Sequence, residues 1–223
     1  MKKIIYNITP FTTVDYKDHL SCIVWFNSCN MRCKYCYNPD IVNSKSGLYT
    51  IEDLINFLMK RVGLLDGVVL SGGEASLHDL EYICKSISTL GFNIKLDTNG
   101  SNPNMLKTLL DKKLLDFVAI DFKSTKDKFY DITKSNYYNK FLESLHILEN
   151  SGIEYEVRTT LHEDLLDEDD INEMQTVLVE NGYDKNYYIQ NFLETENLSN
   201  LKLSEKHFDK SKLISDLNIV WRN

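Results

Sequence analysis

The stretch GVVLSGGEASLHDLEYICKSISTLG (67–91) contains one complete strand-and-helix unit. Its first part, 67–73, is a short apolar run that ends in glycines, which predicts a buried strand followed by a turn. From 77 onward apolar residues recur at helical spacing, and Gly91 predicts the end of the helix. A strand followed directly by a helix is the repeating unit of α/β folds with a parallel sheet.

The same alternation continues on both sides of this unit. Further strands are predicted at 21–26, 93–100, 117–124, 154–161 and 186–193. Further helices are predicted at 50–62, after Asn102 and Pro103, at 137–150 and at 168–181. Six strands, each but the last followed by a helix, favour a partial (β/α)6 barrel, with the active site at the C-terminal ends of the strands.

We expect one domain over residues 1–223, with a core at about 17–194 and a C-terminal appendage at 195–223. In the appendage, a short helix is predicted near 204–216. The terminal NIVW (218–221) is predicted to pack as an edge strand.

Composition excludes several classes of protein. The net charge of -8 argues against a nucleic-acid partner, because phosphate binding needs a basic surface. The apolar run in MKKIIYNITP (1–10) is too short for a signal peptide, and no stretch is long enough to span a membrane. We therefore expect a cytoplasmic protein with reduced thiols, and its odd number of cysteines fits poorly with a disulfide framework.

Three of the five cysteines lie in CNMRCKYCYNPD (29–40), with the spacing C-x3-C-x2-C. A structural zinc site and an ordinary ferredoxin cluster each need four protein ligands. Cys22, in a predicted strand, and Cys84, in a predicted helix, do not form a second ligand pair. A third possibility is a [4Fe–4S] cluster in which one iron has no protein ligand.

This loop resembles that of the radical S-adenosylmethionine enzymes. The resemblance rests on Cys29, Cys33 and Cys36, with the aromatic Tyr35 before the third cysteine. It is most similar to the activating enzymes of glycyl-radical proteins, whose pattern usually continues Cys-His-Asn, whereas Tyr37 stands here at the histidine position. The resemblance implies that the three cysteines hold a [4Fe–4S] cluster and that S-adenosylmethionine binds the open iron. It also places Tyr35 and Tyr37 in the cofactor site.

The glycines at the end of the second predicted strand form part of a second motif, SGGEA (71–75). Gly72 and Gly73 allow the backbone to approach a ligand closely, and Glu74 offers an acceptor for an ammonium group. Alone, this pattern is more often a simple strand-to-helix turn. It resembles the family's motif for the methionine amino group of the cofactor.

The third predicted strand ends in LDTNG (96–100). Period-two alternation places Lys95, Asp97 and Asn99 on one face, which predicts either a lined cavity or a solvated turn capped by Asp97. The segment resembles the activase motif that holds the cofactor ribose. Through Asp97 and Thr98, that motif also holds a monovalent cation.

Two later strands carry further polar pairs. In AIDFK (119–123), Asp121 and Lys123 share a face, and the resemblance implies that Asp121 belongs to the cation site. In EYEVRTT (154–160), Glu156 and Arg158 share a face. Arg158 either forms a structural pair with Glu156 or contacts the carboxylate of the cofactor.

The resemblance implies a radical activase. A reduced cluster gives one electron to S-adenosylmethionine, and the resulting 5′-deoxyadenosyl radical takes a hydrogen atom from a backbone glycine of a partner protein. The expected partner is an anaerobic ribonucleoside-triphosphate reductase, and the expected electron donor is a small protein such as flavodoxin or ferredoxin. The segment FTTVDY (11–16) resembles the activase segment that lies beside the peptide substrate.

Two alternatives remain open. A 7-carboxy-7-deazaguanine synthase has a related loop, but it usually has Ser or Thr after the third cysteine to meet magnesium, and Tyr37 cannot serve in that way. A non-catalytic metal-binding or electron-transfer module would leave the polar positions Asp97, Asp121 and Arg158 unexplained.

Overall fold

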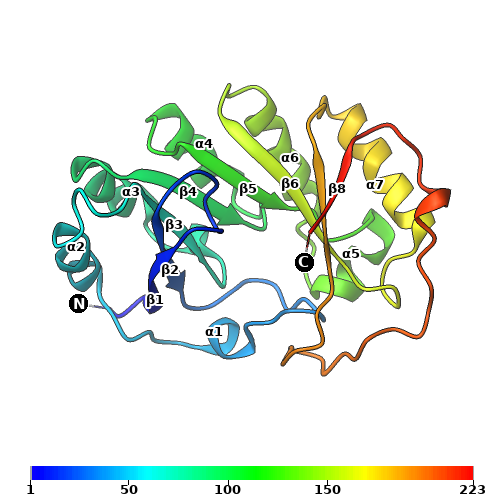
Figure 1. Ribbon diagram of the computed structural model, residues 1–223, viewed down its shortest axis with the longest axis horizontal. Helices are drawn as coiled ribbons and strands as arrows, with labels where there is room; N and C mark the ends of the chain where they lie inside the picture. Colours follow the sequence, from blue (N-terminus) through cyan, green and yellow to red (C-terminus); the bar gives the residue numbers. More distant parts are fainter. Residues whose placement is uncertain (1, 223) are drawn as a thin grey trace. The chain divides into compact units, whose positions relative to one another are not determined.

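The computed structural model describes residues 2–222, which form an α/β fold (Figure 1). The hydrogen-bonded order of its strands follows the chain from β1 to β8. The residues group into two compact units that interleave in sequence. Unit 1 comprises residues up to Asn30, Asp40–Thr98 and Asn102–Ala119, and unit 2 comprises Met31–Pro39, Asn99–Ser101 and Ile120 onward.

Unit 1 contains the N-terminal part of the sheet. Its complete strands are β1 (Ile5–Thr12), β2 (Ser21–Phe26), β3 (Gly67–Gly72) and β4 (Asn93–Thr98). Strand β1 is antiparallel to β2, whereas β2, β3 and β4 are parallel to one another. The core residues of β3, Val68 to Leu70, are fully buried, as the apolar run in the sequence predicts.

Three helices of unit 1 lie along one side of these strands (Figure 1). They are α2 (Ile51–Met59), α3 (Leu80–Thr89) and α4 (Pro103–Asp111), and the 3-10 turn η1 (Ala75–Leu77) precedes α3. Thr50 and Asp53 form the capping box of α2. Asn102 caps α4, with Pro103 in its first turn. Both predicted helix starts are therefore confirmed.

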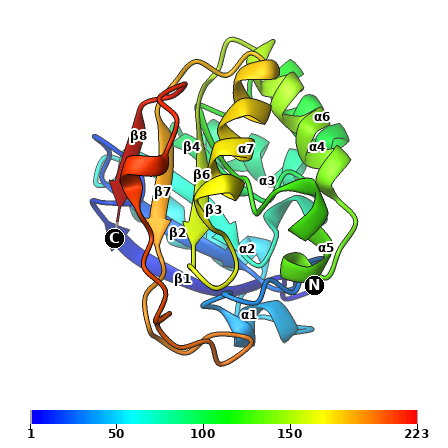
Figure 2. The ribbon, with the colours of Figure 1, turned by 90° about the vertical axis from the view of Figure 1, so that its right-hand side faces the viewer.

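Unit 2 contains the C-terminal part of the sheet. Strand β5 (Phe117–Asp121) crosses from unit 1 into unit 2, and it is followed there by β6 (Glu154–Leu161), β7 (Tyr187–Asn191) and β8 (Ile219–Arg222). Strands β6, β7 and β8 are parallel, so the predicted edge strand at the C-terminus is confirmed. The helices are α5 (Lys126–Thr133), α6 (Tyr138–Glu149) and α7 (Glu168–Glu180), and Figure 2 shows α7 in front of β6.

The sequence did not predict β1, α5 or the short helix α1 (Pro39–Asn43). Strand β1 contains Pro10 and several polar residues, which suit an edge strand with one neighbour. Helix α5 has only eight residues, many of them charged, so its helical periodicity is weak.

The predicted helix near 204–216 is wrong, because only one 3-10 turn, η2 (Lys210–Lys212), is present there. Outside this turn, backbone groups of the segment hydrogen-bond to side chains of α7. Asp209 N–H donates to Glu168 (2.8 Å), and Ile214 N–H donates to Asn172 (2.9 Å). These tertiary bonds satisfy the backbone donors that a helix would otherwise use.

Candidate active site

The Gly-Gly-Glu turn lies against the chain that leaves β2. A Cβ atom on Gly73 would lie 1.8 Å from the carbonyl oxygen of Ser28, and one on Gly72 would lie 2.4 Å from Phe26 N. Gly72 also has φ +114°, a conformation that other residues rarely adopt. Both positions therefore require glycine, and the close approach that they permit is to the segment that leads into Cys29.

Glu74 is held in place by its neighbours in unit 1. The residue is 2% exposed, and Oε1 accepts hydrogen bonds from Ser76 N–H (3.1 Å) and from the Thr98 hydroxyl (2.8 Å). The end of β3 is thereby joined to the end of β4. Glu74 therefore takes part in the turn, and the same contacts fix the direction of its carboxylate.

Two further polar side chains of unit 1 follow the ends of β2 and β3. Asn27 Oδ1 and Ser76 Oγ are buried, and neither has a hydrogen-bond partner within residues 2–222. Buried polar atoms are normally satisfied by protein, water or a ligand. No sequence motif pointed to either residue, since single Asn and Ser residues are common in turns.

The polar face predicted on β4 is occupied by an ion pair. Lys95 Nζ lies 3.2 Å from Asp97 Oδ1, and both side chains are largely buried. Lys95 also donates to the backbone carbonyl of Asp15, and the Asp15 carboxylate accepts from the Thr12 hydroxyl. The segment 12–15 is thus tied to the polar face of β4 within unit 1. Asn99, in unit 2, accepts from Ser101 N–H (3.0 Å) and so forms a turn at the strand end.

In unit 2, Asp121 lies between two cations. Its carboxylate is 3.0 Å from Arg158 Nε and 3.0 Å from Lys123 Nζ. Burial alone would raise the pKa of Asp121, but the charges of Arg158 and Lys123 outweigh it, and the pKa lies below its ordinary value. A carboxylate, a guanidinium and an ammonium are therefore held together where β5 ends beside β6.

Arg158 does not pair with Glu156. Glu156 instead makes two hydrogen bonds to the guanidinium of Arg222 on β8 (3.0 and 2.8 Å), and Arg222 stacks over Tyr188. Glu156 thus has a structural ion-pair partner, but that partner is Arg222, 66 positions away, and not Arg158. The alternation of residues along one strand could not identify it.

The cysteine loop spans both units, with Cys29 in unit 1 and Cys33 and Cys36 in unit 2. No disulfide joins any of the described cysteines. Burial raises the pKa of the Cys33 thiol to about 11, and nearby Lys123 partly opposes this shift. Within residues 2–222, no three His, Cys, Asp or Glu side chains are grouped so that they could hold a metal ion, so the three-cysteine metal site stays a prediction.

The unit 2 part of the loop is held from two sides through its backbone. Arg32 N–H donates to Thr133 O (2.7 Å) and Lys34 N–H to Ile132 O (3.0 Å), which ties the loop to the last turn of α5. On the other side, Leu198 N–H donates to Cys36 O (2.9 Å) and Ser199 N–H to Lys34 O (3.2 Å). The segment 192–201, which the sequence placed partly in the appendage, therefore supports the cysteine loop.

The two tyrosines of the loop have different surroundings. Tyr35 is buried, and its hydroxyl is 3.5 Å from the carbonyl oxygen of Lys123. The Tyr37 hydroxyl accepts from Leu193 N–H (2.8 Å), and its ring stacks on Phe192 with centroids 5.7 Å apart. Tyr37 thus joins the cysteine loop to the segment that follows β7.

We predict that Asp121→Asn destabilises the protein at neutral pH, because Arg158 and Lys123 lose their counter-charge. Since the Asp121 side chain is 25% exposed, the expected cost in the free energy of unfolding is about 1–3 kcal/mol. Because the pKa of Asp121 is lowered, its contribution to stability is complete above the ordinary aspartate pKa of 3.8. That contribution is lost as the pH falls through the lower pKa of the folded state. Urea denaturation at several pH values should show a constant difference at about pH 5–8 and a smaller one in stronger acid. A difference that grows on acidification would contradict this assignment.

We also predict that Tyr37→Phe loosens the segment after β7 while it keeps the ring stack on Phe192. Loss of the acceptor for Leu193 N–H should speed hydrogen exchange at residues 193–199 by about fivefold, which corresponds to ~1 kcal/mol of local stability. Tyr82→Phe, at an exposed position on α3, is the matched control and should leave these amides unchanged. Equal exchange in both variants would mean that the Tyr37 hydroxyl does not hold the segment.

Comparison with known proteins agrees with this geometry. The family model described as the radical SAM superfamily matches residues 23–177. A putative glycyl-radical enzyme activating enzyme of Methanocaldococcus jannaschii is 32% identical over 184 residues, which cover 78% of this chain and 75% of the relative. The pyruvate formate-lyase 1-activating enzyme of Escherichia coli K12 is 28% identical over 158 residues, which cover 66% of this chain and 63% of the relative.

Solved structures support the fold. SuiB of Streptococcus suis, bound to S-adenosylmethionine, superposes with a TM-score of 0.67 at 13% identity, over 90% of this chain and 52% of SuiB. This chain therefore spans about half the length of that protein. The predicted α/β fold of the radical S-adenosylmethionine type is confirmed. The family model covers more than half of the chain, and by this match the chain belongs to the radical SAM superfamily.

Proposed function

We propose that this protein is a glycyl-radical activase whose partner is an anaerobic ribonucleoside-triphosphate reductase. The observation that carries the proposal is the three-cysteine loop, which leaves β2 directly beside the Gly-Gly-Glu turn of β3. The names of the relatives from M. jannaschii and E. coli support an activase rather than another radical enzyme. The identity of the reductase as partner rests on the sequence motifs alone.

The cofactors of the superfamily are a [4Fe–4S] cluster and S-adenosylmethionine. The donor set fits them, because thiolates are the preferred ligands of iron–sulfur clusters and three thiolates leave one iron open. Cys29, Cys33 and Cys36 would hold the cluster. When bound and reduced, the cluster supplies one electron that cleaves the S–C5′ bond of S-adenosylmethionine, which yields methionine and a 5′-deoxyadenosyl radical.

The residues of the chain bind and orient the cofactor. Glu74 would accept the methionine ammonium, because its buried carboxylate is already aimed by Ser76 and Thr98. The unsatisfied Asn27 and Ser76 oxygens add polar capacity beside it. Arg158 would bind the carboxylate of the cofactor. Its Nε already pairs with Asp121, and a guanidinium has enough donors to bind a second anion as well.

The remaining site residues have supporting roles in the proposal. Asp97, Thr98 and Asp121 would hold a monovalent cation, whereas Asn99 would contact the ribose. Gly72 and Gly73 keep the turn close to the cysteine loop, Tyr35 and Tyr37 shape the loop, and Lys123 balances Asp121. Burial of these groups excludes water, which protects a reactive radical from side reactions.

Other expectations follow from this assignment. No described helix is long and apolar enough to cross a bilayer. We propose that the protein acts in the cytoplasm, where its thiols stay reduced.

The contact of Tyr37 with Leu193 N–H does not favour the deazaguanine synthase alternative, because it commits the Tyr37 hydroxyl to the protein backbone.

We predict that replacing any one of Cys29, Cys33 or Cys36 by alanine abolishes cluster assembly, because two thiolates cannot hold a cubane with an open iron. Cys22→Ala and Cys84→Ala are the matched controls and should keep full iron content, since both residues are fully buried core side chains. Iron and sulfide analysis after anaerobic reconstitution measures the difference. Loss of iron in the Cys84 variant alone would instead indicate a fourth protein ligand.

The activity itself is tested by electron paramagnetic resonance. The reconstituted protein, S-adenosylmethionine and photoreduced deazaflavin should produce a glycyl radical on an anaerobic ribonucleotide reductase from the same cell. The signal should disappear when the acceptor glycine of the reductase is changed to alanine. Magnesium-dependent turnover of 6-carboxytetrahydropterin, with no radical on the reductase, would overturn the proposal.

A further inference from the structure

The chain that follows β7 forms a loop with no apolar core of its own. We call residues 193–201 the strap. All of its residues are described, and they form no helix or strand. Leu198 and Leu201 are half-buried, and Asn197, at 4% exposure, is the one buried residue of the strap. A loop with so few buried groups opens easily, so its conformation depends strongly on Asn197.

The Asn197 side chain closes the strap on itself. Its Nδ2 donates to the carbonyls of Thr195 (3.0 Å) and Leu201 (2.9 Å), and its Oδ1 accepts from Leu201 N–H (2.8 Å). The Asn197 carbonyl accepts from Asn200 N–H (3.2 Å), in a turn where Asn200 has φ +54°. Asparagine tolerates this left-handed conformation. A buried amide that bonds to both ends of a short loop fixes the path of that loop.

The two residues after Asn197 bond to the cysteine loop. Leu198 N–H donates to Cys36 O (2.9 Å), and Ser199 N–H donates to Lys34 O (3.2 Å). Because both donors directly follow Asn197, its side-chain bonds hold them in place. Asn197 therefore acts on the backbone of a predicted cluster ligand through the adjacent peptide group.

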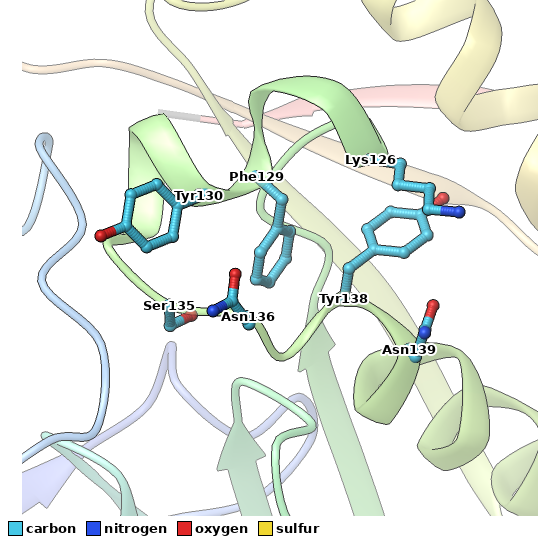
Figure 3. A pocket seen from close by; sticks show the side chains of 7 residues that line it. All are labelled: Lys126, Phe129, Tyr130, Ser135, Asn136, Tyr138 and Asn139. Carbon is cyan, nitrogen blue, oxygen red and sulfur yellow. The ribbon is translucent and has the colours of Figure 1, made fainter.

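The other side of the cysteine loop has a support that is packed more firmly. There the loop bonds to Thr133 O, at the end of α5. Figure 3 shows Phe129 projecting from α5 toward the turn that carries Ser135. Phe129 is 2% exposed and packs edge-on against Tyr138, with ring centroids 5.7 Å apart. Aromatic packing thus stabilises this support, whereas the strap depends on one polar side chain.

We propose that Asn197 is a positioning residue for the cluster ligand Cys36. By holding the strap against the cysteine loop, it fixes the ligand and limits the access of water to this end of the loop. The proposal rests on the proposed function, in which Cys29, Cys33 and Cys36 hold a [4Fe–4S] cluster. It assigns a task in the chemistry of the cofactor to a segment that no sequence motif marked.

The expected consequence of the strap is a low reduction potential of the cluster. Reduction adds negative charge to a group that its thiolate ligands already make negative, and water stabilises the more highly charged form. Limited access of water therefore lowers the potential. A low potential suits a cluster that must reduce a sulfonium group, so an ordered strap favours the reaction of the proposed function.

The test compares Asn197→Ala with Asn172→Ala in the full-length protein. Asn172, on α7, is the matched control, because its side chain also bonds to backbone groups of the C-terminal segment. These are Lys212 O (3.0 Å) and Ile214 N–H (2.9 Å), and both lie outside the strap. For each protein we would record thermal melting, the rate of iron loss to a chelator, and the cluster potential from a redox titration followed by electron paramagnetic resonance without S-adenosylmethionine.

Asn197→Ala should lose iron about tenfold faster than the wild type, because the strap no longer holds Cys36. Its cluster potential should shift to a less negative value. In the iron-free protein, hydrogen exchange at Leu198 and Ser199 should be about fivefold faster. Asn172→Ala should match the wild type in each measurement.

A second variant, Asn197→Asp, keeps the acceptor for Leu201 N–H but loses the Nδ2 donors. It should lose iron at a rate between those of the wild type and Asn197→Ala. If Asn197→Ala melts abnormally, the iron-loss rate of Asn197→Asp decides the question, and a wild-type rate would count against the proposal.

Two results would overturn the assignment of Asn197. One is faster exchange at Leu198 with an unchanged rate of iron loss and an unchanged potential, since the role of Asn197 would then be structural only. The other is an equal change in Asn197→Ala and Asn172→Ala. A wild-type cluster that does not cleave S-adenosylmethionine would instead contradict the proposed function, and it would leave the comparison of the variants valid.

Discussion

The contact between Gly73 and Ser28 is the constraint on which the arrangement of unit 1 depends. The polypeptide leaves β2 and β3 at the same end, and the two exits touch so closely that no side chain fits between them. Two backbone hydrogen bonds fix this approach, from Gly73 N–H to Phe26 O (2.9 Å) and from Glu74 N–H to Ser28 O (2.9 Å). A larger residue at position 73 would displace either the turn or the start of the cysteine loop. The turn and the loop therefore share one geometry.

Polar groups at the strand ends are oriented by other side chains of the protein. Glu74 is oriented by Ser76 and Thr98, and Asp121 by Arg158 and Lys123. Such contacts lower the cost of holding buried charges and keep each side chain in one rotamer. A site of this kind needs little rearrangement when a charged ligand enters, which reduces the entropy lost on binding.

The sequence predicted the features that depend on local patterns. Apolar runs identified β3 and its neighbours, the Thr50–Asp53 pair identified the start of α2, and cysteine spacing identified the family. It failed where tertiary contacts decide the structure. The segment 204–216 bonds to α7 rather than forming a helix, and Glu156 finds its partner at Arg222. No local signal marks either contact, because both join residues more than 40 positions apart.

The same distinction applies to the cysteine loop. Its spacing is visible in the sequence, but its support comes from α5 on one side and from residues 198 and 199 on the other. These supports use backbone groups, which place no requirement on residue type and so leave no trace in a single sequence. They also satisfy donors and acceptors of the loop without using the thiols of Cys33 or Cys36. The path of the loop is thus fixed through its backbone, by contacts that do not depend on the thiols of Cys33 and Cys36.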